Sequence, residues 1–232
     1  MLLHSGWGDS SIWLPLLARL ALRYRVVRYD QRGFGRSPAP ESPYGQLGDL
    51  MAVLDWCDVA EALVVGYSGG AGPATGLALA SPERLRGLML LAPGVEDYPW
   101  PEDDPYVAEF VALLTAGNRA GLVSLGLRTW ASAGADEAAQ VQVRGAVEAI
   151  FRVGELERPD PPVYGRLGQI RVPAIMVVGD RDYPMVRDSA AAIAGRIPDC
   201  RTVGAPGADH MLPLRIPDQI ATLIDELDAS GT

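Results

Sequence analysis

The stretch from Ala62 to Ala80 constrains the fold of this chain more than any other. It opens with Ala62-Leu63-Val64-Val65, which is typical of a buried strand, and continues through the turn Gly66-Tyr67-Ser68-Gly69-Gly70 into a helical run. The glycines allow strand and helix to approach closely, and free N–H groups at the helix N-terminus favour negative charge developing beside Ser68. Taken alone, the same pattern also fits a serine that only caps a helix.

Further apolar segments alternate with helical patterns, which predicts an α/β fold with a doubly wound, mostly parallel sheet of about six strands. The strands are expected at residues 1–4, 24–29, 62–65, 86–92, 173–179 and 200–203. The helices between them are expected at residues 12–20, 46–58, 71–80, 188–196 and 217–227. Parallel sheets of this kind bind ligands at the carboxyl ends of their strands.

The alternation breaks between residues 95 and 169, where helical patterns cover residues 105–116, 118–131 and 136–152. We therefore expect an α/β core built from residues 1–94 and 170–232, with a helical cap inserted at 95–169. The aromatic side chains of the cap are expected to form its core, and some of them to line a substrate pocket: Tyr106, Phe110, Trp130 and Phe151.

Composition narrows the class of partner. The 232 residues carry a formal charge of −9, which argues against binding to nucleic acid or to an anionic membrane surface. The two cysteines, Cys57 and Cys200, form no metal-ligand or redox pattern, and no glycine loop has the pattern of a phosphate cradle. There is no run of 18 apolar residues and no charged segment preceding an apolar leader. We expect a cytoplasmic protein that acts on a small molecule without a metal or an organic cofactor.

Ser68, Asp182 and His210 each follow a predicted strand, so the fold would bring them to one edge of the sheet. A serine hydroxyl becomes a good nucleophile when a base accepts its proton, and histidine is the base that works near neutral pH. The chain has two histidines, and His210 lies in a late loop after the acidic candidates whereas His4 ends the first strand.

Several carboxylates compete for the role of the acid that orients the histidine. Asp180 and Asp182 both follow the strand at 173–179, and Asp209 directly precedes His210. Asp209 is better suited to hold the histidine loop, and Glu96 and Asp97, after another strand, are weaker candidates.

Four motifs in this order resemble the α/β-hydrolase fold superfamily, and within it the esterase, lactonase and C–C hydrolase group. They are His4-Ser5-Gly6-Trp7-Gly8, Asp30-Gln31-Arg32-Gly33-Phe34-Gly35-Arg36-Ser37, Gly66-Tyr67-Ser68-Gly69-Gly70, and Gly179-Asp180-Arg181-Asp182 with Asp209-His210. Together they cover nearly the whole chain except the cap. The chain begins at the strand that the family places third, so the resemblance implies a sheet lacking the usual first two strands.

The resemblance implies a nucleophile at Ser68, an acid at Asp182 and a base at His210, and it favours Asp182 over Asp180. It also implies an oxyanion hole made by the Gly69 N–H and by a second N–H from Gly6 or Trp7, of which Gly6 is favoured. His4 would make structural hydrogen bonds, and Asp30 and Arg32 would belong to a salt-bridged turn beside the site.

We therefore predict a serine hydrolase that cleaves a small, largely apolar ester or lactone through an acyl-enzyme. The alternatives are a C–C bond hydrolase and a ligand-binding protein that keeps the fold with little turnover. The predicted strand near Val26 would be an apolar edge, which favours a homodimer.

Overall fold

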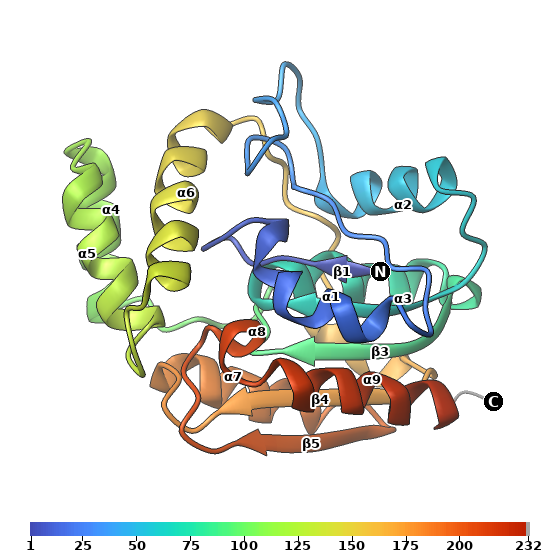
Figure 1. Ribbon diagram of the computed structural model, residues 1–232. Helices are drawn as coiled ribbons and strands as arrows, with labels where there is room; N and C mark the ends of the chain where they lie inside the picture. The colour runs from blue at the N-terminus through green and yellow to red at the C-terminus, as the bar shows by residue number, and fades with distance from the viewer. Residues whose placement is uncertain (231–232) are drawn as a thin grey trace.

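The computed structural model describes residues 1–230, in which five parallel strands form one sheet in the order β1-β2-β3-β4-β5 (Figure 1). The strands are β1 (Leu2–Leu3), β2 (Ala62–Tyr67), β3 (Leu85–Leu91), β4 (Ala174–Gly179) and β5 (Cys200–Ala205). The predicted α/β class and the parallel sheet are thereby confirmed.

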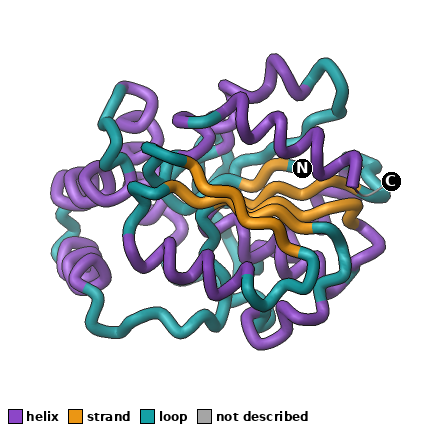
Figure 2. Tube along the Cα trace, turned by 90° about the horizontal axis from the view of Figure 1, so that it is seen from below, coloured by secondary structure: helices purple, strands orange, loops and turns teal. Residues whose placement is uncertain are grey.

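Helices cover both faces of the sheet (Figure 2) because successive side chains of each strand point to opposite faces. On one face, Val65 and Met89 join the apolar cluster that includes residues of α1 (Leu14–Leu20) and α9 (Pro217–Ser230). On the other face, Val64 and Leu88 join the cluster that includes residues of α2 (Gln46–Trp56), α3 (Ala71–Ala80) and α7 (Pro184–Ala194). Two apolar cores therefore hold the sheet between layers of helices.

The predicted strand at residues 24–29 is wrong, and the count of six strands with it. This segment pairs with β1 through one isolated parallel bridge, between Leu2 and Arg28, and the Leu2 N–H donates to the Val27 carbonyl (2.9 Å). The pairing goes no further because the Gln31 N–H donates to the His4 imidazole (2.9 Å) rather than to a neighbouring backbone. Side-chain hydrogen bonding replaces the ladder at this edge.

The three helices expected in the insertion are α4 (Pro105–Thr115), α5 (Arg119–Trp130) and α6 (Glu137–Val153), within a few residues of their predicted bounds. Each begins after a side chain that accepts a backbone hydrogen bond from its first turn, namely Asp104, Asn118 and Asp136. They lie together beyond the carboxyl ends of the strands (Figure 1). The division of the chain into core and cap stays a prediction.

Two local departures follow from short-range chemistry. α7 begins at Pro184 rather than at residue 188, since proline fits the first position of a helix. The short helices η1 (Ser10–Trp13) and α8 (Leu212–Arg215) lie within segments expected to be partly loop.

Among residues 1–230, no helix is long and apolar enough to cross a lipid bilayer.

Candidate active site

Ser68 occupies a strained turn between β2 and α3. Its φ angle is 52°, in the left-handed region that costs a non-glycine residue energy and is kept where the surrounding structure enforces it. The turn is tight: a Cβ on Gly66 would lie 2.7 Å from the Gly70 carbonyl oxygen, and one on Gly70 would lie 2.7 Å from the His4 carbonyl oxygen. Both positions therefore require glycine, and the turn holds the Ser68 hydroxyl at the end of the sheet.

The structure brings Ser68, His210 and Asp182 into one hydrogen-bonded chain. The Nε2 atom of His210 lies 2.9 Å from Ser68 Oγ, and its Nδ1 atom lies 3.0 and 3.1 Å from the two carboxylate oxygens of Asp182. A carboxylate only accepts hydrogen bonds, so Nδ1 carries the proton and Nε2 has a free lone pair facing the serine hydroxyl. His210 is 1% exposed and Asp182 3% exposed, which shields both from water.

The competing carboxylates are bound elsewhere. Asp180 is exposed and accepts a hydrogen bond from the Gly207 N–H (2.7 Å), so it ties the two loops together rather than touching the imidazole. Asp97 accepts from the N–H groups of Val163 and Tyr164 at the start of the short helix η4 (Tyr164–Gln169). The geometry thus places Asp182 beside His210, where the sequence left Asp180 open.

The loop after β1 lies against the Ser68 turn. A Cβ on Gly69 would lie 3.4 Å from the Gly6 nitrogen, so the Gly6 N–H is close to the residue that follows the serine. The Trp7 N–H instead donates to Ser5 Oγ (3.1 Å). This arrangement leaves Gly6 as the better placed of the two predicted donors.

His4 makes the structural hydrogen bonds expected of it. Its Nδ1 atom lies 2.8 Å from the Ser5 carbonyl oxygen, and its Nε2 atom accepts the Gln31 N–H, which fixes one neutral tautomer. Burial lowers the pKa of His4 below its usual 6.5. His4 therefore orders the two loops beside the site without reaching Ser68.

A cavity of about 300 Å³ opens at Ser68 and Gly69. Apolar side chains dominate its wall, and they come from the loops that follow β1 and from the helices α4 and α6: Trp7, Phe34, Phe110 and Ile150. Of the predicted substrate-binding residues, Phe110 lies on this wall. Trp130 packs its ring on His210, with 4.6 Å between ring centroids. Phe151 is placed elsewhere, since the Arg119 guanidinium lies 3.9 Å from the centroid of its ring, and Ile150 takes the wall position.

A second cavity of about 350 Å³ adjoins the first at Gly69, and carboxylates line it: Glu96, Asp97, Glu157 and Asp160. Burial, together with the neighbouring carboxylates, raises the pKa of Glu96 and of Asp160. The negative potential at this mouth disfavours substrates that carry phosphate or carboxylate groups there. No group of three or more His, Cys, Asp or Glu side chains within residues 1–230 has the arrangement of a metal site.

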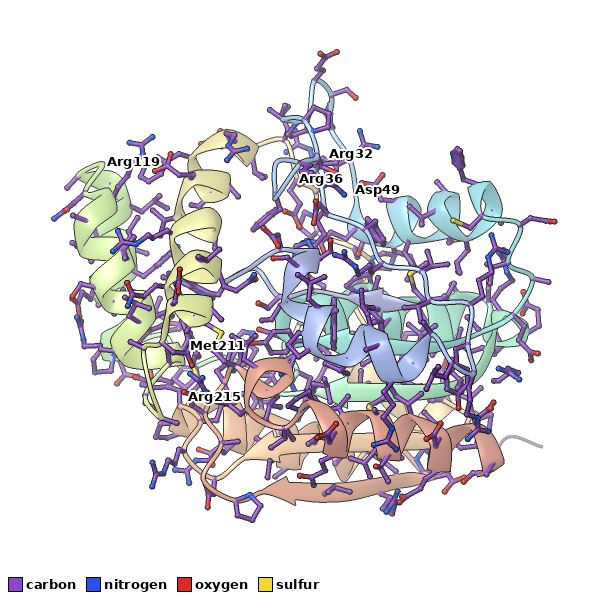
Figure 3. The ribbon with its side chains drawn as sticks, in the orientation of Figure 1. Arg32, Arg36, Asp49, Arg119, Met211 and Arg215 are labelled. Atoms are coloured by element: carbon purple, nitrogen blue, oxygen red, sulfur yellow. The ribbon has the colours of Figure 1, made fainter. Side chains whose placement is uncertain are left out.

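Other residues hold the site in place. Tyr67 is fully buried and its hydroxyl donates to the His210 carbonyl oxygen (2.8 Å). The Asp30 turn is structural as expected, but its ion pair differs from the predicted one. Arg32 binds Asp49 on α2 through two hydrogen bonds of 2.7 Å, while Asp30 accepts from the N–H groups of Ser10 and Arg36 (Figure 3). The role of Tyr67 could not be predicted from the sequence, because it stands at a position of the Gly-x-Ser-x-Gly motif that any residue can occupy.

Comparison with known proteins places this geometry in context. A family model described as the alpha/beta hydrolase family matches residues 1–223. A putative carbamate hydrolase RutD of Caulobacter segnis is 36% identical over 113 residues, which cover 46% of this chain and 40% of that protein's length. A pimeloyl-[acyl-carrier protein] methyl ester esterase of Legionella pneumophila (strain Lens) is 25% identical over 247 residues, covering 97% of this chain and 93% of that protein.

Among solved structures, the enol-lactonase from Burkholderia xenovorans LB400 superposes with a TM-score of 0.78 and 23% identity. The superposition covers 97% of this chain and 89% of that one. At this level of identity the likeness shows a common fold.

Proposed function

This chain belongs to the alpha/beta hydrolase family, and from that premise we propose that it is a serine hydrolase with Ser68 as its nucleophile. The observation that carries the proposal is the contact of 2.9 Å between Ser68 Oγ and a His210 nitrogen whose lone pair is free. The strained turn at Ser68 supports the same role, since strain at a single residue is characteristic of functional sites.

In the proposed reaction, Ser68 Oγ attacks the substrate carbonyl carbon while His210 Nε2 accepts the hydroxyl proton. Asp182 stabilises the imidazolium that results and keeps its ring in place. His210 then returns the proton to the leaving oxygen, which departs as an alcohol. Water attacks the acyl-enzyme with His210 again as base, and the products are a carboxylic acid and free Ser68.

The N–H groups of Gly69 and Gly6 are the proposed oxyanion hole. Their proximity supports this, and the Gly69 N–H is the group next to the nucleophile in the strand–turn–helix arrangement. Two donors of this kind stabilise the tetrahedral intermediate more than the ground state, which is where such groups accelerate a reaction.

The substrate we propose is a small, largely apolar ester or lactone. The apolar wall of the 300 Å³ cavity supports an apolar acyl group, and the adjoining carboxylates argue against anionic substrates. The names of the similar proteins include a methyl ester, an enol lactone and a carbamate, all of which present a carbonyl bonded to oxygen.

Hydrolysis of a panel of short nitrophenyl esters, small lactones and a carbamate tests the proposal. We expect turnover of at least one ester or lactone, and a loss of about 10⁴-fold or more in Ser68→Ala. The exposed Ser42 offers a matched control, and Ser42→Ala is expected to keep full activity. Full activity in folded Ser68→Ala would contradict the mechanism, and tight binding of a small apolar ligand without turnover would favour a binding protein.

A further inference from the structure

A cluster of ionic and backbone hydrogen bonds joins the cap to the loop that carries His210. We call it the strap and define it as Asp209, Arg215 and the cap segment 131–136. Asp209 is fully buried, and its carboxylate accepts hydrogen bonds from the Met211 N–H (3.0 Å), from Arg215 Nε (3.0 Å) and from the Ala133 N–H (2.8 Å). One buried side chain therefore holds the residue on one side of His210 and a cap backbone group at the same time.

Arg215 completes the strap from α8. Its Nη1 atom donates to Asp136 (2.6 Å), the residue that caps α6, and its Nη2 atom donates to the Gly134 carbonyl. The guanidinium side chain is 14% exposed, so water screens its pair with Asp209 only weakly. Figure 3 shows Arg215 beside Met211, next to the cap helices.

The same cap segment also reaches the acid loop. Ser132 Oγ donates to the Arg181 carbonyl oxygen (3.0 Å), one residue before Asp182. Trp130, which ends α5 just before the strap, packs its ring against the His210 ring at a tilt of 45°. The cap thus contacts both loops that orient the imidazole.

We propose that the strap positions His210 for proton transfer and that Arg215 cancels the buried charge of Asp209 beside it, so that Asp182 alone sets the protonation of the ring. The proposal rests on the proposed function for its catalytic meaning. Arg215 and Asp209 act through His210 and are positioning residues. Without Arg215, a buried anion next to His210 would favour the imidazolium, which cannot accept the proton of Ser68.

The titratable and charged groups around His210 come from five segments of the chain. They are Asp182 on the acid loop, Tyr67 at the end of β2, Asp209 on its own loop, Arg215 on α8 and, through Arg215, Asp136 at the start of α6. Tyr67 stays neutral because burial raises its pKa well above the usual value. The charges that remain are those of the carboxylates and of one guanidinium. Removal of Asp209 or of Arg215 should therefore shift the titration midpoint of His210 in a direction that can be stated beforehand.

The test is a pH titration of the His210 ring by NMR in the full chain, together with kcat and KM as functions of pH. The chain contains two histidines, so the His210 signal is assigned as the one that is absent from His210→Gln. In Arg215→Met we expect the titration midpoint and the acid limb of kcat to move up by about one pH unit. Misplacement of the base should also lower kcat by up to about 100-fold, with KM near that of the wild type.

Further variants separate charge from structure. Asp209→Asn should move the midpoint down, and the double variant Asp209→Asn/Arg215→Met should return it to the wild-type position because the net charge is restored. Arg215→Lys keeps the positive charge, so its titration midpoint should stay near that of the wild type. Arg201→Met, which removes an arginine paired with Glu226 at the half-exposed surface of β5, is the control and should change neither quantity.

A loss of thermal stability in Arg215→Met with an unchanged midpoint would overturn the proposal, because the strap would then be only a structural contact. If Arg215→Met does not fold, an unchanged or raised midpoint in Asp209→Asn overturns it equally. The titration needs no turnover, so it tests the strap even if no substrate is hydrolysed. A failure of the proposed function is seen separately, as wild-type protein that hydrolyses no ester, lactone or carbamate of the panel.

Discussion

At the residue scale, the site depends on which side chain each carboxylate faces. Asp182 and Asp180 are two residues apart at the end of β4, yet Asp182 is buried against His210 and Asp180 is exposed and bonded to the Gly207 N–H. Both residues lie in the turn after β4 rather than in the strand, where side chains two residues apart would share one face, so they can have different partners.

This difference gives a paired prediction. Asp182→Asn should lower kcat by about 10⁴-fold, because an amide in place of the carboxylate no longer fixes the tautomer that leaves Nε2 free. Asp180→Asn keeps a polar partner for Gly207 and should retain most of the activity. The measurement is kcat of both variants and of the wild type at about pH 8. Equal losses, or a larger loss at Asp180, would mean that Asp182 is not the acid.

His4 gives a stability prediction whose sign follows from its environment. Burial lowers the pKa of His4 below 6.5, so the unfolded chain takes up a proton that the folded chain refuses. The free energy of unfolding should therefore fall as the pH drops below 6.5, by up to about 1.4 kcal/mol per pH unit from this group.

Urea unfolding of the wild type and of His4→Gln at several pH values checks this. The variant should be less stable at neutral pH because the hydrogen bonds of His4 are lost, but it should lose less stability on acidification than the wild type, since its side chain does not titrate. Identical pH slopes for the two proteins would show that His4 is not the group responsible.

The positions of Ser68, Asp182 and His210 could be predicted because each follows a strand and parallel strands end at one edge of the sheet. The roles of Tyr67 and Arg215 could not, since nothing in their spacing shows that they bond to the His210 loop across the fold. The ion pair of Arg32 with Asp49 was missed for the same reason, because α2 is brought to the turn only by tertiary packing.

At the element scale, periodicity predicted the helices of the insertion well, because their amphipathic faces and capping residues are local signals. It failed at residues 24–29, where an apolar run reads as a strand. The partner of that run is the two-residue strand β1, and His4 takes up the next backbone donor, Gln31. Strand formation there depends on the neighbour rather than on the segment itself.

α4 supplies the prediction at this scale. Phe110 lines the cavity at Ser68, whereas the next residue, Val111, is 53% exposed. Phe110→Ala should lower kcat/KM for esters with longer apolar acyl chains by about 10- to 200-fold, the range for lost apolar contact in a pocket. Val111→Ala, the matched control, should leave it unchanged. Equal values of kcat/KM for Phe110→Ala and the wild type across the acyl series would remove α4 from the substrate pocket.

At the scale of the whole molecule, the sheet has an edge at β1 that is covered by the segment 24–29 through a single bridge. The sequence predicts a homodimer through this edge, and an edge that is paired by a single bridge is a place where a second copy can add a strand. Sedimentation velocity over a wide concentration range is the measurement, and it should show a monomer–dimer equilibrium that Val26→Lys shifts towards monomer. A monomer at every concentration would contradict the expectation.

The fold as a whole could be predicted from the sequence because the alternation of strands and helices repeats along most of the chain. The catalytic function that we propose depends on one atom, Ser68 Oγ, which a strained turn holds against His210. A test of the account should therefore report on that atom directly.

The most direct measurement is covalent labelling with a fluorophosphonate, read out by the mass of the intact protein and by mapping of the modified peptide. We predict one adduct per chain, located on Ser68, and none in Ser68→Ala. Its formation should slow strongly in His210→Gln, because the base is then absent. An unlabelled wild type, or an adduct that persists in Ser68→Ala, would contradict the assignment of Ser68 as the nucleophile.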